Sequence, residues 1–283
     1  MNRTFSKVLY FPITRIITGT VICFLLLVGV QNFVTKPILE SAISSKPIAD
    51  TIVNYISVAV LLLSYFYLFR IYERRKITEL SRANLMKELF GGFILGFAIL
   101  SLVILILYLS GYYSIMSVSG LSYMLAPFSV LVVAALLEEI VFRLLVYRIF
   151  ENWLGTYISL FIIAVVFEVP HWFNNNVTFL SVILGLIFGF AHGIMYTYTK
   201  RLWLPLGFHL GWNFAQPFYG SNLSGLDDIG SIIKAKFSGP TLLTGTVYGI
   251  EDSIFSIVLL AMVSVLFLYF SIKKNRIIKD KTV

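Results

Sequence analysis

The sequence predicts an all-α, polytopic membrane protein with about eight transmembrane helices around a polar intramembrane cavity. Of its 283 residues, 58% are hydrophobic and 13% are charged, whereas a soluble domain has roughly 25% charged residues. So few charges could not cover a surface that faces water. Apolar runs of about 20 residues, the length that crosses a bilayer as a helix, recur along the chain. A β-barrel would alternate in segments of about ten residues, and the sequence has no such pattern.

Eight apolar runs are long enough to be transmembrane helices. Lipid offers no hydrogen-bond partners, so each run must satisfy its backbone groups internally as a helix. The first run follows a basic N-terminal segment and is too long for the apolar part of a signal peptide, so we expect it to be retained. The predicted spans are residues 16–34, 51–70, 89–110, 124–147, 157–172, 179–199, 202–218 and 251–272.

Lys and Arg residues are unequally divided between the two ends of these spans. Positive charge marks the cytoplasmic side, so both termini are predicted in the cytoplasm of a multi-pass cell-membrane protein, and the simple pattern fits a bacterial plasma membrane. The net charge of +8 indicates this orientation and contact with anionic lipid, not nucleic-acid binding. Of the 22 basic residues, 17 are assigned to the cytoplasm: Arg3, Lys7, Arg15, Arg70, Arg74, Arg75, Lys76, Arg82, Lys87, Arg148, Lys200, Arg201, Lys273, Lys274, Arg276, Lys279 and Lys281.

Two connections and one thiol complete this outline. The charged cytoplasmic segment 71–88 is predicted to be an ordinary solvated loop, with a lipid-contacting or partner-binding helix as the alternative. The Gly-, Ser- and Thr-rich segment 219–250, which contains Asp227 and Asp228, is predicted to be an outer connector, with a gating role as the alternative. The single cysteine, Cys23, excludes an internal disulfide and any CxxC metal site.

Ionisable residues inside the predicted spans are the candidates for function. Each costs about 2.5–3.5 kcal/mol at the centre of a membrane helix, so such residues are rare and face the interior of a bundle. All three histidines of the chain belong to this set, while P-loop, GxSxG and HExxH motifs are absent from the sequence. The set comprises Glu138, Glu139, Arg143, Glu168, His171, His192 and His209.

The stretch EEIVFR (138–143) contains adjacent carboxylates with different expected partners. Residues four apart share a helix face, so Glu139 and Arg143 are predicted to pair. Glu138 lies about 100° around the helix from Glu139 and is left free as the reactive carboxylate. The alternative is a purely structural ion pair that locks helices together.

The stretch FEVPH (167–171) places a histidine directly after a proline. Pro170 is predicted to break or kink the helix before His171, which requires a protein-lined or water-filled surrounding. Glu168 either orients His171 or is merely an acid near water, and the second interpretation is favoured.

The stretch HLGWN (209–213) presents two polar side chains on one helix face, His209 and Asn213. Both can donate hydrogen bonds to a developing oxyanion. The alternative is an interhelical hydrogen-bonded patch, which is common in membranes. His192 is expected to be a packing residue or a secondary polar contact.

Together these groups suit peptide hydrolysis by an activated water. Glu138 and His171 would hold and deprotonate the water, while His209 and Asn213 would stabilise the tetrahedral intermediate. Alternatively, Glu138, His171 and His209 could bind zinc as a His₂Glu set with an open water position. The metal-free version is preferred and no cofactor is predicted, because a base and oxyanion donors are already present.

These three stretches resemble the EExxxR, FxxxH and HxxxN motifs of the CAAX-protease and bacteriocin-processing (CPBP, Abi) family of intramembrane endopeptidases. The motifs occur in the family's order within residues 120–218. The resemblance implies a helical membrane fold with a water-accessible cavity. It also implies that Glu138 and His171 activate the water and that His209 and Asn213 form the oxyanion site. Glu139 and Arg143 would then be supporting residues.

The predicted function is therefore an intramembrane endopeptidase that acts on a membrane-associated peptide or protein. Its expected partners are the lipid bilayer and this substrate, with no nucleic acid. A non-enzymatic immunity or scaffold protein and a proton-coupled transporter are the alternatives, although the inverted repeats typical of transporters are not evident. The predicted division is 1–120 for N-terminal helices, 121–218 for the protease core, and 219–283 for the outer loop, last helix and basic tail.

Overall fold

The computed structural model describes residues 7–227 and 229–279, and these residues form mainly helices. Arg3, Asp228 and Lys281 lie outside the described residues. Within the described part, six helical segments are long and apolar enough to cross a bilayer, so the chain is a polytopic membrane protein. These segments are Pro12–Ala42, Lys46–Tyr72, Leu85–Leu109, Thr156–Phe173, Phe179–Thr199 and Ile254–Lys273.

Four of these segments are the helices α4, α5, α9 and α12, and the other two contain changes of helix type. The first consists of α2 (Pro12–Val30), a π-helical turn (Gln31–Thr35) and α3 (Lys36–Ala42). The fourth consists of α8 (Thr156–Glu168) and the 3₁₀ helix η4 (Val169–Phe173). The uninterrupted helices are α4 (Lys46–Tyr72), α5 (Leu85–Leu109), α9 (Phe179–Thr199) and α12 (Ile254–Lys273).

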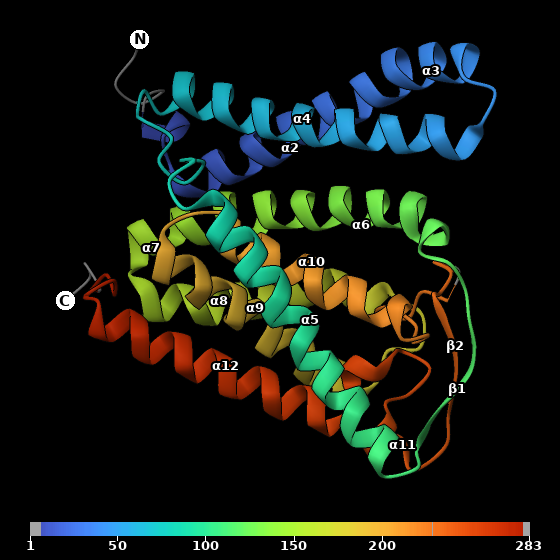
Figure 1. Cartoon of the computed structure of the whole chain (residues 1–283). Helices are drawn as coiled ribbons and strands as arrows, with labels where there is room; N and C mark the ends of the chain where they lie inside the picture. The colour runs from blue at the N-terminus through green and yellow to red at the C-terminus, as the bar shows by residue number, and fades with distance from the viewer. Residues whose placement is uncertain (1–6, 228, 280–283) are drawn as a thin grey trace.

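The two remaining predicted spans, 124–147 and 202–218, are also helical but form shorter α-helices. The first comprises α6 (Leu125–Glu138), the π-helix η3 (Glu139–Tyr147) and α7 (Arg148–Leu154). The second is α10 (Trp203–Phe218), with 16 residues. Both lie within the bundle, where α10 is buried over most of its length between α5 and α6 (Figure 1).

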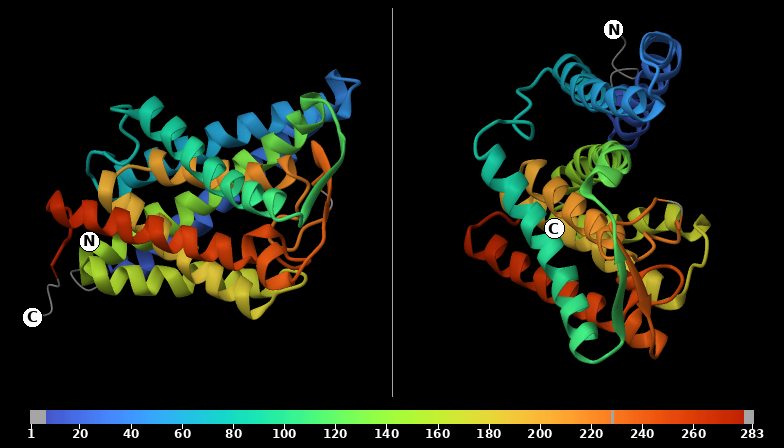
Figure 2. Two further views of the ribbon diagram at one scale, coloured as in Figure 1. Left: turned by 60° about the horizontal axis from the view of Figure 1, so that its bottom comes forward. Right: turned by 45° about the vertical axis from the view of Figure 1, so that its right-hand side comes forward.

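The described terminal regions of the chain and the two β-strands lie at opposite ends of the helix bundle. The described parts of the N- and C-terminal regions lie at one end, and β1 and β2 lie at the other (Figure 1). The α2–α4 hairpin stands to one side of the remaining helices (Figure 2). The helices run back and forth between these two ends. Lys200 and Arg201 therefore lie at the end that carries the terminal regions, whereas Lys234 and Lys236 lie on β2 at the opposite end.

Contact between α5 and α10 depends on glycines spaced four apart on both helices. A Cβ atom at Gly207 would lie 2.1 Å from the Leu89 carbonyl oxygen, and one at Gly96 would lie 2.3 Å from that of Phe208. Small residues at this spacing let helix backbones approach closely in a membrane, where packing replaces the hydrophobic effect as the driving force. This close crossing holds α10, and with it His209, in the centre of the bundle.

A small antiparallel sheet closes the end of the bundle that is remote from the termini. β1 (Tyr113–Val118) pairs with β2 (Ile233–Phe237), although well over a hundred residues separate them. The all-α prediction therefore holds for the membrane helices but missed this sheet. β2 lies in the segment 219–250, which was predicted to be only a connector, and β1 is too short for period-two alternation to stand out.

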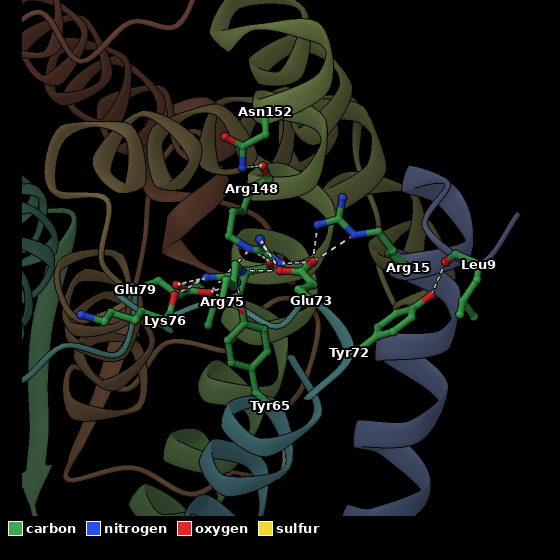
Figure 3. A network of polar contacts seen from close by, with 11 residues as sticks. Leu9, Arg15, Tyr65, Tyr72, Glu73, Arg75, Lys76, Glu79, Arg148 and Asn152 are labelled. Carbon is green, nitrogen blue, oxygen red and sulfur yellow. Dashed lines mark hydrogen bonds and ion pairs between the residues drawn. The ribbon is translucent and has the colours of Figure 1, made fainter. Parts of the chain in front are cut away.

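The segment after α4 is not the solvated loop that was predicted, because it folds back onto the bundle through ion pairs (Figure 3). Glu73 accepts hydrogen bonds from Arg15, Arg75 and Arg148, the last at 3.1 Å. Glu79 is buried and accepts a 2.8 Å hydrogen bond from Arg75. The network ties α2, the end of α4 and α7 together, so these charges hold helices in place.

We expect acid to weaken this network. Burial alone would raise the pKa of Glu73, but the Arg148 charge and hydrogen bonds from Arg148, Arg75 and Arg15 outweigh it and lower that pKa from 4.5 to about 2. A lowered pKa adds stability that is complete above pH 4.5 and is lost as the pH falls toward 2. Thermal unfolding between pH 7 and pH 2.5 should show a steeper loss of melting temperature for wild type than for Glu73→Gln. Equal slopes would contradict this role.

Candidate active site

The first polar stretch lies where α6 becomes the π-helix η3. Glu138 ends α6 and Glu139 begins η3. π-helical turns occur mostly as short insertions within α-helices and are frequent at functional sites. The Glu139 side chain is fully buried, whereas 32% of the Glu138 side chain is exposed. Two adjacent carboxylates therefore occupy different environments.

Arg143 links the first polar stretch to the second. Its Nε atom lies 3.2 Å from Glu139 Oε2, and both side chains are completely buried, so the predicted pairing is present. Its guanidinium carbon lies 4.7 Å from the centre of the Phe167 ring, in cation–π contact. None of the guanidinium nitrogens has a hydrogen-bond acceptor within the described residues. Glu139 and the aromatic ring are therefore what stabilise this buried cation.

His171 lies just after the point where α8 changes type. The α-helix ends at Glu168 and the 3₁₀ helix η4 continues through Pro170, which confirms the predicted break. His171 Nδ1 lies 2.9 Å from the Phe167 carbonyl oxygen, so Nδ1–H donates there and Nε2 is left as an acceptor. Phe167 thus orients His171, whereas no hydrogen bond joins His171 to Glu168 in the described structure.

His209 lies between the two adjacent carboxylates. Its Nδ1 atom is 2.9 Å from Glu139 Oε1, and its Nε2 atom is 3.8 Å from Glu138 Oε2. Since an ionised carboxylate can only accept, Nδ1 carries a hydrogen and donates it to Glu139. This contact fixes the imidazole ring and turns Nε2 toward Glu138 and the cavity.

All four side chains predicted to be catalytic line one cavity. The cavity has a volume of about 720 Å³, and its wall includes Glu138, His171, His209 and Asn213. The predicted supporting residues, Glu139 and Arg143, lie behind the wall, fully buried. The structure therefore brings the three sequence stretches to one place. The roles assigned to these residues remain predictions.

Phe188 is a residue of this site that sequence reasoning missed. Its ring centre lies 5.5 Å from that of Phe167, 5.2 Å from that of His209 and 4.0 Å from that of His192. Phe188 therefore packs between Phe167 on α8 and His209 on α10, and also contacts His192 one turn along its own helix. In the sequence it is one of many apolar residues in its helix, so no local signal marks it.

His192 is completely buried behind the same wall. Its Nδ1 atom bonds to the Phe188 carbonyl oxygen at 2.8 Å, and its ring centre lies 5.2 Å from that of His209. Its Nε2 atom has no hydrogen-bond partner within the described residues. These contacts agree with the expected packing and secondary polar role.

Two further acids lie in the cavity wall. Glu168 is only 2% exposed, so the interpretation as an acid near water is wrong. Glu251 was missed because it lies at the edge of a predicted span. It accepts hydrogen bonds from Trp212 at 2.9 Å, from Gln216 at 2.8 Å and from Ser224.

Within the described chain, one group of side chains has the spacing of metal ligands. It consists of Glu139, His192 and His209, whose ligand atoms lie within 4.8 Å of one another. The set predicted for zinc, Glu138, His171 and His209, is not drawn together in this way. In the observed group, Glu139 already contacts Arg143 and His209, and the wall includes only His209. A catalytic zinc keeps an open position for water, so these residues do not fit a zinc ion that activates water in the cavity.

Part of the chain matches a known protein family. Residues 120–215 match the family model described as "Type II CAAX prenyl endopeptidase Rce1-like", so the chain contains a domain of this family. The matched range includes all three polar stretches. No curated protein and no solved structure was found to match the chain.

Proposed function

We propose that this chain, which carries an Rce1-like domain, is an intramembrane endopeptidase that uses a water activated by glutamate and histidine. The observation that supports this most directly is the single cavity that Glu138, His171, His209 and Asn213 share. It lies inside a helix bundle whose family is a protease family. A base together with oxyanion donors suits the hydrolysis of a peptide bond.

In the proposed reaction, Glu138 and His171 position a water molecule and Glu138 takes a proton from it. His171 can accept a hydrogen bond at Nε2 because its Nδ1–H is held by the Phe167 carbonyl oxygen. The hydroxide oxygen bonds to the carbonyl carbon of the substrate, and the carbonyl oxygen becomes an oxyanion. The carbon–nitrogen bond then breaks, the proton moves from Glu138 to the leaving amine, and a carboxylic acid and an amine are released. Such general-base catalysis contributes about 10²–10⁴-fold.

His209 and Asn213 are proposed to stabilise the oxyanion. His209 donates from Nδ1 to Glu139, so it must be cationic to donate from Nε2 as well. Glu139 stabilises that cation, and Arg143 compensates the charge of Glu139 from the other side. The amide of Asn213, one turn further along the same wall, supplies a second donor.

The charge distribution gives the proposed site an orientation in the membrane. With both termini in the cytoplasm, the end that carries β1 and β2 faces away from it. The cavity extends toward that end, since its wall includes Asp50 near the start of α4 and the loop residues Ser224 and Ile229. We therefore propose that the substrate is a membrane-associated peptide or protein reached from the non-cytoplasmic side of a cell membrane, in keeping with a bacterial plasma membrane.

The proposal is tested by incubating purified protein in lipid nanodiscs with a library of internally quenched peptides. We expect wild type to cleave a subset of the library, and His171→Ala to lose this activity while remaining folded. Mass spectrometry of the products identifies the bond that is cut. Cleavage that persists undiminished in His171→Ala and Glu138→Gln would contradict the mechanism. No cleavage by wild type would favour the immunity, scaffold or transporter alternatives.

We expect chelation to leave this activity unchanged. The described group with the spacing of metal ligands, Glu139, His192 and His209, has only His209 in the cavity wall, so removing free metal should not affect the proposed base, Glu138. The measurement is the cleavage rate before and after dialysis against 1,10-phenanthroline, with a known zinc peptidase as the positive control. Loss of activity that added zinc restores would overturn the metal-free mechanism.

A further inference from the structure

The cavity of the proposed active site is lined by more carboxyl groups than the proposed reaction uses. Besides Glu138, its wall contains Asp50, Glu168 and Glu251, which we call the acidic wall. Among the described lining residues there is no lysine or arginine to balance these acids. Ionisable side chains inside a membrane protein are costly and rare, so these carboxyl groups are candidates for binding a ligand, and a carboxylate suits a cationic one.

Glu168 is the member of the acidic wall whose hydrogen bonding is incomplete. The residue is 98% shielded from solvent, with 2% exposure, and its Oε2 atom has no hydrogen-bond donor within the described residues. A buried acceptor without a donor is destabilising unless a ligand or water supplies the donor. Glu251 differs, because Trp212, Gln216 and Ser224 already donate to it.

The position of Glu168 depends on a glycine of the neighbouring helix. A Cβ atom at Gly185 would lie only 1.5 Å from Glu168 Oε2, so the carboxylate occupies space that any other residue at 185 would fill. Gly185 also lines the cavity. The backbone of α9 thus leaves room for this carboxylate in the cavity wall.

We propose that the cavity, whose wall also includes Glu251 and Asp50, binds a peptide segment with a lysine or arginine side chain, whose cationic group is held by Glu168. This inference rests on the proposed endopeptidase function and names the class of its substrate. The cationic group donates to Glu168 Oε2, and the aliphatic part of the same side chain packs against apolar wall residues such as Leu184 and Phe188. A carboxylate presented to the same wall would meet like charges and be disfavoured.

The test compares peptides that differ in one side chain. N-acetylated, C-amidated quenched peptides carry Lys, Arg, Gln or norleucine at each position around a cleaved bond. We expect the best Lys or Arg peptide to exceed its Gln counterpart by at least about tenfold in kcat/KM, the size of a charge-assisted hydrogen bond. This ratio should shrink to about two- to threefold in Glu168→Gln. The control Glu40→Gln, which removes an exposed carboxylate on α3, should keep the wild-type ratio.

A binding experiment separates this inference from the proposed function. Fluorescence anisotropy with Glu138→Gln measures peptide affinity without cleavage, and we expect the Lys or Arg peptide to bind about tenfold more tightly than the Gln peptide. In Glu138→Gln/Glu168→Gln the two affinities should be nearly equal. If wild type cleaves nothing but this preference is found, the enzyme proposal fails and the cation site stands. Equal affinities in Glu138→Gln, or a preference that survives Glu168→Gln, would overturn the cation site.

Discussion

Replacing Glu138 with glutamine is expected to abolish peptide cleavage while leaving the fold intact. The amide has the shape of the carboxylate but cannot take a proton from water. We expect kcat to fall by about 10²–10⁴-fold, with little change in KM because the cavity keeps its shape. The Glu138 side chain is 32% exposed and forms no hydrogen bond among the described residues, so its loss should not destabilise the bundle.

Two measurements on the same nanodisc samples test this expectation. Steady-state kinetics give kcat and KM, and the intrinsic tryptophan fluorescence on heating gives the melting temperature. Glu40→Gln is the matched control, because it is the same substitution at an exposed site on α3 outside the cavity. A Glu138→Gln variant that turns over substrate at the rate of the control would remove Glu138 from the mechanism.

Replacing Arg143 with methionine is expected to have the opposite pattern, with a large loss of stability. Methionine fills much of the same volume but leaves the Glu139 carboxylate buried without its cation. Removing one partner of a buried ion pair costs about 3–5 kcal/mol, a large part of the roughly 5–15 kcal/mol that stabilises a typical protein. The cation–π contact with Phe167 is lost as well. The variant should therefore unfold at a clearly lower temperature and be recovered in lower yield.

A double variant separates the lost pair from other damage at this position. Glu139→Gln/Arg143→Met has no buried charge left to compensate, so it should recover most of the stability that Arg143→Met loses. Unfolding of the detergent-solubilised protein by SDS titration provides the comparison, with Glu138→Gln as the reference. If Arg143→Met and Glu138→Gln prove equally stable, the division into a structural pair and a free carboxylate is wrong.

The spacing of polar residues along each helix could be interpreted without the structure. The i, i+4 relation predicted the Glu139–Arg143 pair, and Pro170 predicted the end of α8, because both effects act within one or two helical turns. The lengths of the apolar runs likewise predicted helices that match the six candidate spans. These predictions succeeded since local geometry alone decides them.

Contacts between helices were beyond such reasoning. Phe188 packs between Phe167 and His209, and the burial of Glu168 depends on the absence of a side chain at Gly185. The glycine spacing in α5 and α10 is typical of a close helix crossing, but the sequence does not show which helix each of them packs against. The segment after α4 was misread because its charges suggested water, whereas arginines from two other helices pair with its Glu73.

By itself, the sequence determined that this protein is a helical membrane protein and which few polar side chains its membrane helices contain. Composition and periodicity suffice for that, because lipid offers no hydrogen-bond partners and every span must therefore satisfy its backbone groups as a helix. Only the tertiary structure decided which of these side chains reach a common cavity and which are buried behind it. That choice separates Glu138 from Glu139 and leaves Glu168 Oε2 without a donor among the described residues. Which side chains reach the cavity depends on how the helices cross, because residues distant in sequence provide both the space around each side chain and its bonding partners.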